Sequence, residues 1–185
     1  MTRRTALRGA AIGLAVTFVT AVAGCGTIHD AAAPTCVQKG PDTLVLMAQS
    51  VPTASRIPCI SSYPAGWHFA SVDVRSGRSE FVLDSDRAGI SAVRVALADR
   101  CETAGATQIP SDEPETRRYE RILSVRDGFR AVRTYEFEGG CVTYEFSFGR
   151  PGRALVNEAS VALGFVTRAE LAERVREQSD GGLRL

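Results

Sequence analysis

Residues 129–148, FRAVRTYEFEGGCVTYEFSF, contain the clearest structural pattern of the chain. Apolar and polar residues alternate on both sides of Gly139-Gly140, which is the pattern of two antiparallel strands joined by a tight turn. A two-residue loop made of these glycines places Tyr135 opposite Tyr144. We therefore expect a β-hairpin whose aromatic side chains share one face.

The two faces of this hairpin differ in chemistry. The same register pairs Phe137 with Val142 and adds Phe146 and Phe148 to the aromatic face. The opposite face carries Thr134, Glu136, Thr143 and Glu145. One apolar and one polar face indicate an antiparallel sheet that is covered on one side only.

Further strands precede the hairpin. Turn residues separate four segments with strand-like composition, Trp67–Arg75, Arg78–Ser85, Ile90–Ala98 and Arg117–Val125. Together with the hairpin they predict a six-stranded antiparallel meander. The residues between the third and fourth of these segments, 102–116, are polar and read as a loop.

Two of the turns predict a register. A Ser-Gly turn at residues 76–77 places Val72 opposite Phe81 and Ala70 opposite Leu83, which forms another apolar face.

An Asp127-Gly128 turn is less regular, because a two-residue loop puts Leu123, Val125 and Val132 on the polar face of the sheet. Either this loop is longer or the sheet is partly covered on both sides.

Helical periodicity occurs at both ends of the region. A short helix is expected after Asp42 as N-cap, with Pro52 ending it. After residue 152 the apolar period changes to 3.6, which predicts a helix that ends near Gly164. Thr167 and Glu170 have the spacing of a capping box.

The helix that this capping box opens is expected to run to about Gln178. The fold class is therefore α+β, an antiparallel meander with C-terminal helices packed on one face. Residues 41–185 are expected to form one globular domain.

The N-terminus has the composition of an export signal. Arg3, Arg4 and Arg8 give it a positive start, and the stretch Gly9–Gly24 that follows is uncharged. A basic segment, a short apolar core and small residues before a cleavage point are typical of a secretory signal peptide.

The end of this segment, Val22-Ala23-Gly24-Cys25, resembles the lipobox of bacterial lipoproteins. The resemblance covers only residues 1–25. It implies cleavage between Gly24 and Cys25, a diacylglyceryl group on the Cys25 thiol, and a protein held by membrane lipid on the extracytoplasmic face of the cell membrane. Residues 26–35 are small and polar, so we expect residues 25–40 to form a lipidated tether.

Two alternatives concern the same segment. An uncleaved single-pass anchor would need about 17–25 apolar residues, and Gly9–Gly24 provides 16 with interruptions. The pair Arg3-Arg4 is compatible with twin-arginine export as well as with the general secretory route.

The cysteine count is consistent with export. Five cysteines are present, and removing an acylated Cys25 leaves Cys36, Cys59, Cys101 and Cys141. An even number of cysteines in a secreted chain predicts disulfides, with three possible pairings for four residues. We favour Cys36–Cys59 with Cys101–Cys141, because each pair closes a local region.

Charge argues against a nucleic-acid partner. The segment before Cys25 contains three of the 22 basic residues and none of the 21 acidic ones, so the mature chain carries about −2. Both signs are interspersed, unlike the basic surfaces that bind nucleic acids. An envelope protein or a lipid remains a possible ligand.

Motifs for catalysis are missing from the sequence. It contains no nucleophile elbow, zinc-protease helix motif or phosphate-binding loop, and with two histidines we expect no metal and no cofactor. His68 is the main candidate for a catalytic base. Glu136 and Glu145 would lie diagonally, about 7–8 Å apart, a spacing compatible with glycoside hydrolysis. A surface histidine and a solvated polar face are the simpler interpretations.

Two other features have structural interpretations. Asp84 and Asp86 begin like a calcium loop, but Ala88 stands where a third ligand is needed, so a turn is expected. Trp67, the only tryptophan, is expected in the core.

The sequence thus predicts a non-catalytic binding or structural lipoprotein of the cell envelope. A lipid-anchored hydrolase is the alternative.

Overall fold

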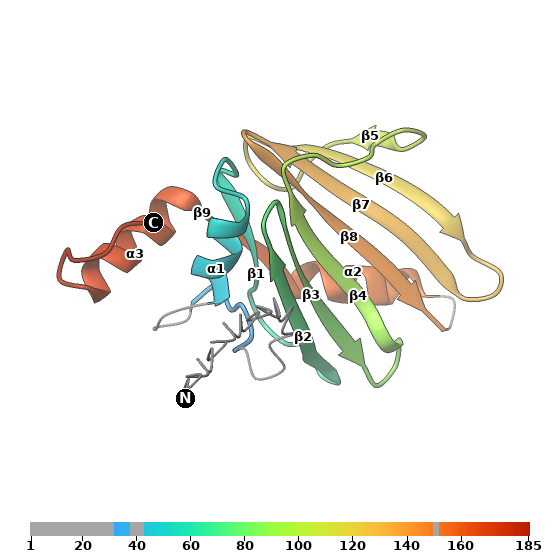
Figure 1. Ribbon diagram of the computed structural model, residues 1–185. Helices are drawn as coiled ribbons and strands as arrows, with labels where there is room; N and C mark the ends of the chain where they lie inside the picture. The colour runs from blue at the N-terminus through green and yellow to red at the C-terminus, as the bar shows by residue number, and fades with distance from the viewer. Residues whose placement is uncertain (1–31, 38–42, 150–151) are drawn as a thin grey trace, which may run out of the picture.

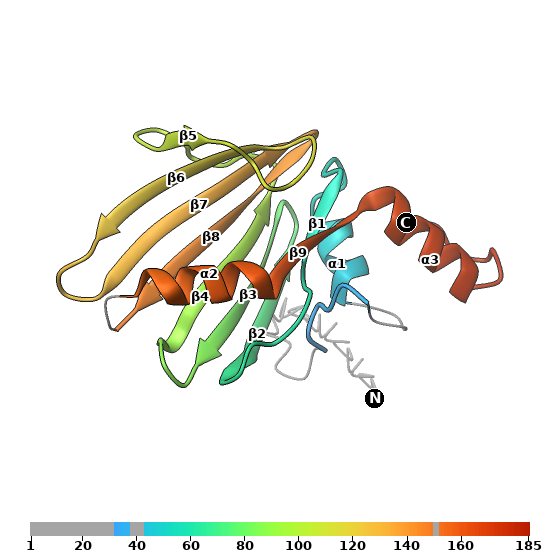
Figure 2. The same cartoon turned by 180° about the vertical axis from the view of Figure 1, so that it is seen from behind.

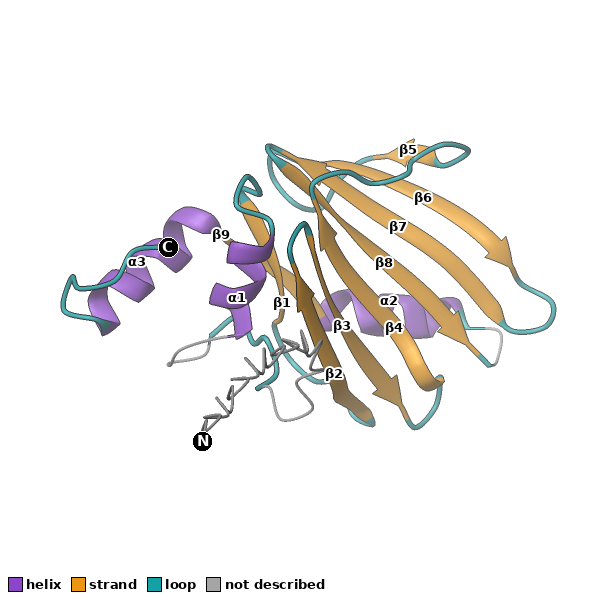
Figure 3. Ribbon diagram, in the orientation of Figure 1, coloured by secondary structure: helices purple, strands orange, loops and turns teal. Residues whose placement is uncertain are grey.

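The computed structural model describes residues 32–37, 43–149 and 152–185. Predictions about Gly24, Cys25 and Asp42 lie outside these residues. Nine strands and three helices follow one another in this part of the chain (Figures 1 and 3). They are α1 (Thr43–Ser50), β1 (Arg56–Ile60), β2 (Trp67–Arg75), β3 (Arg78–Ser85), β4 (Gly89–Ala98), β5 (Thr107–Ile109), β6 (Arg117–Ser124), β7 (Phe129–Phe137), β8 (Gly140–Phe148), α2 (Arg153–Ala162), β9 (Leu163–Thr167) and α3 (Arg168–Gln178).

The main sheet confirms the α+β prediction. It is antiparallel and contains seven strands in the order β2-β3-β4-β8-β7-β6-β5. Two meanders, β2-β3-β4 and β5-β6-β7-β8, therefore meet where β4 pairs with β8. A single meander would have placed β6 next to β4. Alternation alone cannot choose between these orders, because every strand offers the same kind of apolar face.

A second sheet was not predicted. Strand β1 pairs with β9 in antiparallel fashion, and all five residues of β1 are buried. Its sequence, RIPCI, lacks alternation and contains Pro58, so it resembles a loop. In β9, Gly164 lies opposite Cys59, and a Cβ there would come within 2.5 Å of Ser61 Oγ. A larger residue at position 164 would therefore force the Ser61 side chain to move.

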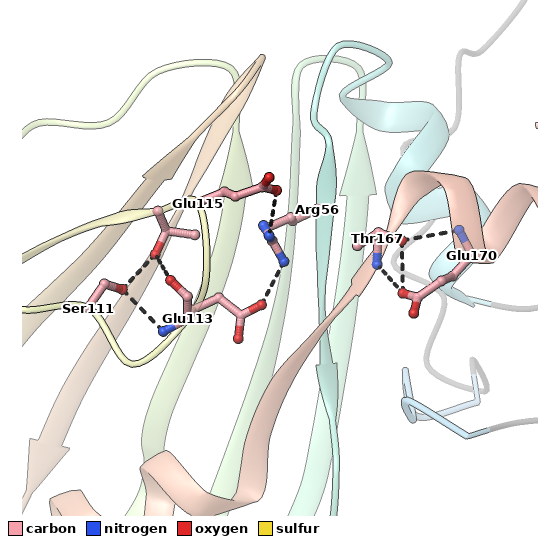
Figure 4. Close-up of polar contacts among 7 residues, drawn as sticks. Arg56, Ser111, Glu113, Glu115, Thr167 and Glu170 are labelled. Carbon is pink, nitrogen blue, oxygen red and sulfur yellow. Dashed lines mark hydrogen bonds and ion pairs between the residues drawn. The ribbon is translucent and has the colours of Figure 1, made fainter.

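The helices occupy different places. Helix α2 crosses one face of the main sheet (Figure 2). It ends at Ala162, close to the predicted end at Gly164. Helices α1 and α3 lie beside the β1–β9 pair (Figures 1 and 2). The predicted capping box of α3 is confirmed: Thr167 Oγ1 accepts from the Glu170 amide, and the Glu170 carboxylate accepts from the Thr167 amide (Figure 4).

Arg168 links α3 to the end of α1. Its Nη2 donates to the carbonyl oxygens of Ala48 at 2.7 Å and Val51 at 2.8 Å, and its Nε donates to that of Ala54 at 2.7 Å. Carbonyls at a helix C-terminus lack partners within the helix. The guanidinium of Arg168 therefore supplies hydrogen-bond donors to the backbone carbonyl groups at and just after the end of α1.

The first hairpin has the predicted register near its turn. Val72 lies opposite Phe81, but a bulge after Phe69 places Phe69, and not Ala70, opposite Leu83. An extra residue in one strand cannot be recognised from alternation over so few positions.

The last hairpin differs from its predicted register by two residues. Tyr135 pairs with Val142, and the turn is formed by Glu138 and Gly139. Gly139 has φ +74°, and a Cβ there would lie 1.8 Å from the carbonyl oxygen of Thr53. The backbone passes so close to residue 53 that the turn must place a glycine at this point. The predicted faces are still correct, because a slip of two preserves them.

The turn between β6 and β7 is longer than two residues. Ser124 pairs with Arg130, and a bulge lies between Ile122 and Ser124. The loop is thus longer than two residues, as the first alternative held, but Leu123 and Val132 still lie on the polar face.

The core lies between the main sheet and the elements that cover it. Trp67 is 2% exposed, which confirms its predicted place in the core. Its ring packs edge-on against Phe148, and Phe148 stacks on Phe129. Tyr144 stacks on Phe165 of β9, so the two sheets share one apolar interior.

The polar loop before β6 is fastened to the second sheet. Arg56, on β1, donates to Glu113 at 2.6 Å and to Glu115 at 3.3 Å (Figure 4). Within the loop, the Ser111 and Thr116 hydroxyls lie 2.6 Å apart. Arg56 thereby connects β1 to a segment more than fifty residues later in the chain.

Candidate functional site

The four cysteines expected to form disulfides do so in the favoured pairing. Cys36 bonds to Cys59 and Cys101 to Cys141, with Cα–Cα distances of 5.0 and 6.0 Å. The first bridge joins the segment before α1 to β1, and the second joins the residues just after β4 to the start of β8. The predicted cleavage and acylation positions, Gly24 and Cys25, lie outside the described residues.

The part of the predicted tether that the structure describes is held to β1. The carbonyl of Pro34 accepts from the amide of Ile60 at 2.8 Å, and the amide of Cys36 donates to the carbonyl of Ile60 at 2.9 Å. Residues 34–36 therefore belong to the folded body.

His68 is a surface residue. Its Nε2 lies 3.3 Å from Asp86 Oδ1, and the two side chains are 62% and 72% exposed. Among the described residues the ring has no other polar contact. An exposed pair of this kind has no nucleophile to activate, so the geometry gives the catalytic interpretation of His68 no support.

The proposed carboxylate pair does not form. Glu145 lies opposite Val132, whereas Glu136 lies opposite Cys141. Four residues along the strands separate the two positions, about 13 Å, and Glu136 is paired with Arg117 at 3.0 Å. The diagonal arrangement was wrong because the hairpin register differs by two.

Asp84 and Asp86 belong to a turn, as expected. Asp84 accepts from the amide of Ser91 at 2.7 Å, and Ser85 Oγ accepts from the amides of Arg87 and Ala88. Among the described residues, no group of three or more His, Cys, Asp or Glu side chains could hold a metal ion. In the same part of the chain, no helix is long and apolar enough to cross a membrane.

One cavity lies on the covered face, between β6, β7 and α2. It has a volume of about 440 Å³. Its buried cation, Arg133, donates to Glu120 at 2.6 Å and to Ser160 at 2.7 Å. The guanidinium also lies over the ring of Phe146. The contact with Glu120 neutralises the charge of Arg133, so this guanidinium is less available to an anionic ligand than an unpaired arginine.

A neighbouring polar cluster is also held by contacts within the protein, although the buried Arg118 Nε has no hydrogen-bond partner. Tyr135 donates to Asp112 at 2.9 Å, and Arg118 lies 2.8 Å from the same oxygen. Burial alone would raise the pKa of Asp112, but hydrogen bonds from Arg118 and Tyr135 outweigh it and lower that pKa. Burial raises the pKa of Tyr135 to about 12. The cluster fixes the loop before β6 to the sheet.

A second cavity, on the open face opposite α2, is different. It has a volume of about 510 Å³ and spans β4, β8, β7 and β6. We call it the arginine groove and define it by six of its lining residues: Arg94, Arg121, Leu123, Arg130, Val132 and Glu145.

The register explains how the groove forms. Arg94 lies opposite Glu145, Glu145 opposite Val132, and Val132 opposite Arg121. These residues make one row across four strands. With about 4.8 Å between strands, the two arginines at its ends are about 14 Å apart at the backbone. An open trough between two cations results.

The arginines of the groove are only partly compensated. Arg94 is paired with Glu80 and lies 4.0 Å from Glu145. Arg121 donates to the carbonyl of Ala104 at 3.0 Å. Among the described carboxylates, none pairs with Arg121 or with the exposed Arg130. Guanidinium groups with free donors are suited to binding phosphate or carboxylate.

Sequence reasoning missed this groove, since arginine is the common cation of the whole chain and a single arginine carries no signal. The one available clue was the position of Leu123, Val125 and Val132 on the polar face.

The chain matches no family model, no curated protein and no solved structure.

Proposed function

We propose that this protein is a lipoprotein anchored by Cys25 on the extracytoplasmic face of the cell membrane, where it acts as a non-catalytic binding module. The observation that supports this proposal most is the pairing of the other four cysteines with one another. Of the five cysteines, Cys25 alone has no cysteine partner within the chain. A thiol directly after a lipobox-like segment and outside the disulfides is available for acylation.

Two disulfides also support an extracytoplasmic location. Disulfides form and persist in oxidising compartments and are rare in the cytosol of mesophiles. Both bridges connect elements of the folded body, so their loss would weaken the fold itself.

The arginine groove supports a binding role. The groove is open, and part of its positive charge has no carboxylate partner. The apolar residues Leu123 and Val132 lie between its arginines. Such a surface recognises an anionic group with an adjoining apolar part. The dispersed positions of His68, Glu136 and Glu145 favour this role over the hydrolase alternative.

Metabolic labelling with an alkyne fatty acid tests the anchor. Cells that express the full chain should incorporate the label, and Cys25→Ala should abolish it. Absence of label from the wild-type chain, or equal label in Cys25→Ala, would contradict the proposal. An unlabelled chain that stays in the membrane fraction would instead identify an uncleaved single-pass anchor.

A further inference from the structure

Large apolar side chains are exposed at one end of the main sheet. Ile122, Leu123 and Val125 are 53%, 55% and 56% exposed, and Ile90 is 86% exposed. We call these four residues the apolar rim. Scattered exposed apolar residues are ordinary on protein surfaces. Ile122, Leu123 and Val125 lie close together at the end of β6, with Ile90 at the start of β4, and exposed apolar side chains that group together mark an interaction site.

Register shows that the rim residues share this end. Leu123 is next to the last residue of β6, and Ile90 is the second residue of β4. The strands between them meet at the same end, since Phe129 at the start of β7 lies opposite Phe148 at the end of β8. Figure 1 shows these strand ends and their connecting turns along the lower right margin of the sheet.

Positive charge surrounds the rim. The groove contributes Arg94, Arg121 and Arg130, and the exposed Arg126 lies in the loop between β6 and β7. Arg94 is paired with Glu80, so the other three arginines together with the nearby carboxylates of Asp127 and Glu145 leave a net charge of about +1. The mature chain as a whole is slightly acidic, so the positive charge is concentrated here. Apolar side chains bordered by arginines fit a bilayer interface that carries anionic headgroups.

The chain enters the folded domain close to the sheet end that carries the rim. An anchor at Cys25 would therefore bring this sheet end towards the membrane. Seven residue steps separate Cys25 from Ala32, a reach of at most about 25 Å. Residues 34–36 are bound to Ile60, and a short connection leads from Ile60 to Trp67. Trp67 lies opposite Ser85, at the same sheet end as the rim. Figures 1 and 2 both show this connection and the turns of β3–β4 on the lower side of the molecule.

We propose that the apolar rim and the arginine groove dock on the surface of an anionic lipid bilayer. The rim residues enter the interface, and the arginines of the groove bind phosphate groups of the lipids. This inference rests on the proposed acyl anchor at Cys25, which confines the domain to the membrane surface and leaves its orientation to these contacts.

A second copy of the chain is the main competing occupant. Strand β5 pairs only with residues 118–120 of β6, so the edge of β6 from Arg121 to Ser124 has no strand beside it among the described residues. An open edge can add another strand. The cationic side chains around it would repel an identical surface, which favours the lipid.

A fluorophore at the rim tests the docking. The acylated full chain with Leu123→Cys, labelled with an environment-sensitive dye, is reconstituted into phosphatidylcholine vesicles with or without phosphatidylglycerol. Val161→Cys is the matched control, because Val161 is 72% exposed on α2, away from the rim. We expect a two- to threefold rise in emission for position 123 with phosphatidylglycerol, and no such rise for position 161.

Charge reversal sharpens this test. Each arginine near an anionic leaflet changes partitioning roughly fivefold. Arg126→Glu with Arg130→Glu should therefore lower the ratio of docked to undocked protein at least about 25-fold. Arg75→Glu with Arg100→Glu makes the same change of charge at the opposite end of the sheet and should leave docking intact.

The possible results are distinct. A fatty-acid label together with an unresponsive dye at position 123 would overturn the docking and leave the anchor in place. An equal rise at positions 123 and 161, or a response that survives reversal of Arg126 and Arg130, would also overturn the docking. Dye emission at position 123 that increases with the number of protein molecules per vesicle, together with cross-linked dimers, would show that the rim binds a second copy of the chain. Absence of the fatty-acid label would refute the proposed function itself.

Discussion

Removing the guanidinium that joins α3 to α1 should destabilise the whole domain. Arg168→Met retains the aliphatic part of the side chain and removes three hydrogen bonds of 2.7–2.8 Å to backbone carbonyls. Hydrogen bonds from charged donors contribute about 1.5–3 kcal/mol each. Because Arg168 is only half-buried, water can reach some of these carbonyls, and the Val51 carbonyl also accepts from the amide of Ala54. We therefore expect a loss of about 2–3 kcal/mol in the free energy of unfolding.

Urea unfolding followed by tryptophan fluorescence measures this loss. Trp67 is the only tryptophan and is buried, so its emission reports the opening of the core. The melting temperature should fall by roughly 5–10 °C at this chain length. Arg176→Met on the same helix is the control, because its ion pair with Glu173 is exposed and should contribute under about 0.5 kcal/mol. A change in Arg168→Met no larger than that of the control would refute the reasoning.

Two further predictions concern the disulfides and alkaline pH. Replacing both Cys101 and Cys141 by serine opens a loop with a sequence separation of 40 and should cost about 4 kcal/mol, measured by the same unfolding assay; a loss below about 1 kcal/mol would contradict it. The pKa of Tyr135 is raised by burial from 10.0 to about 12. Stability should therefore be complete below pH 10 and fall as the pH rises towards 12, since the unfolded chain releases the phenolic proton first. Tyr135→Phe should weaken this alkaline loss in urea titrations at pH 9–11.5, and an unchanged pH dependence would show that Tyr135 does not cause it.

The predicted faces of the strands were more accurate than their register. The aromatic face of the last hairpin was identified correctly although Tyr135 pairs with Val142 and not with Tyr144. Alternation has a period of two, so it cannot detect a slip of two residues. The slip follows from the close approach of Gly139 to Thr53, a contact between segments far apart in the sequence.

The order of the strands and the second sheet depend on long-range contacts. Strand β1 is a short buried segment with a proline, and β9 directly follows a helical pattern. Both segments form strands only because they pair with each other, although they are far apart in the sequence. Local propensity cannot anticipate such pairing.

The arginine groove could not be predicted for a related reason. Arg94 and Arg121 lie at the two ends of the groove because β8 and β7 separate β4 from β6, whereas the meander order placed β4 directly beside β6. The positions of Leu123 and Val125 on the polar face were the one local sign of it. The cysteine pairs were easier, because each closes a local region and the favoured pairing follows from sequence separation.

The Cys36–Cys59 bridge also determines how the domain would respond to mechanical force. Helix α1 lies within the loop that this disulfide closes. A pull on the chain before Cys36 therefore passes through the covalent bridge directly to β1, and α1 carries none of the load. Strand β1 in turn meets β9 along five residue pairs, which must be broken before the domain yields. With the proposed anchor at Cys25, a domain built in this way would bear tension at its N-terminus without unravelling from that end.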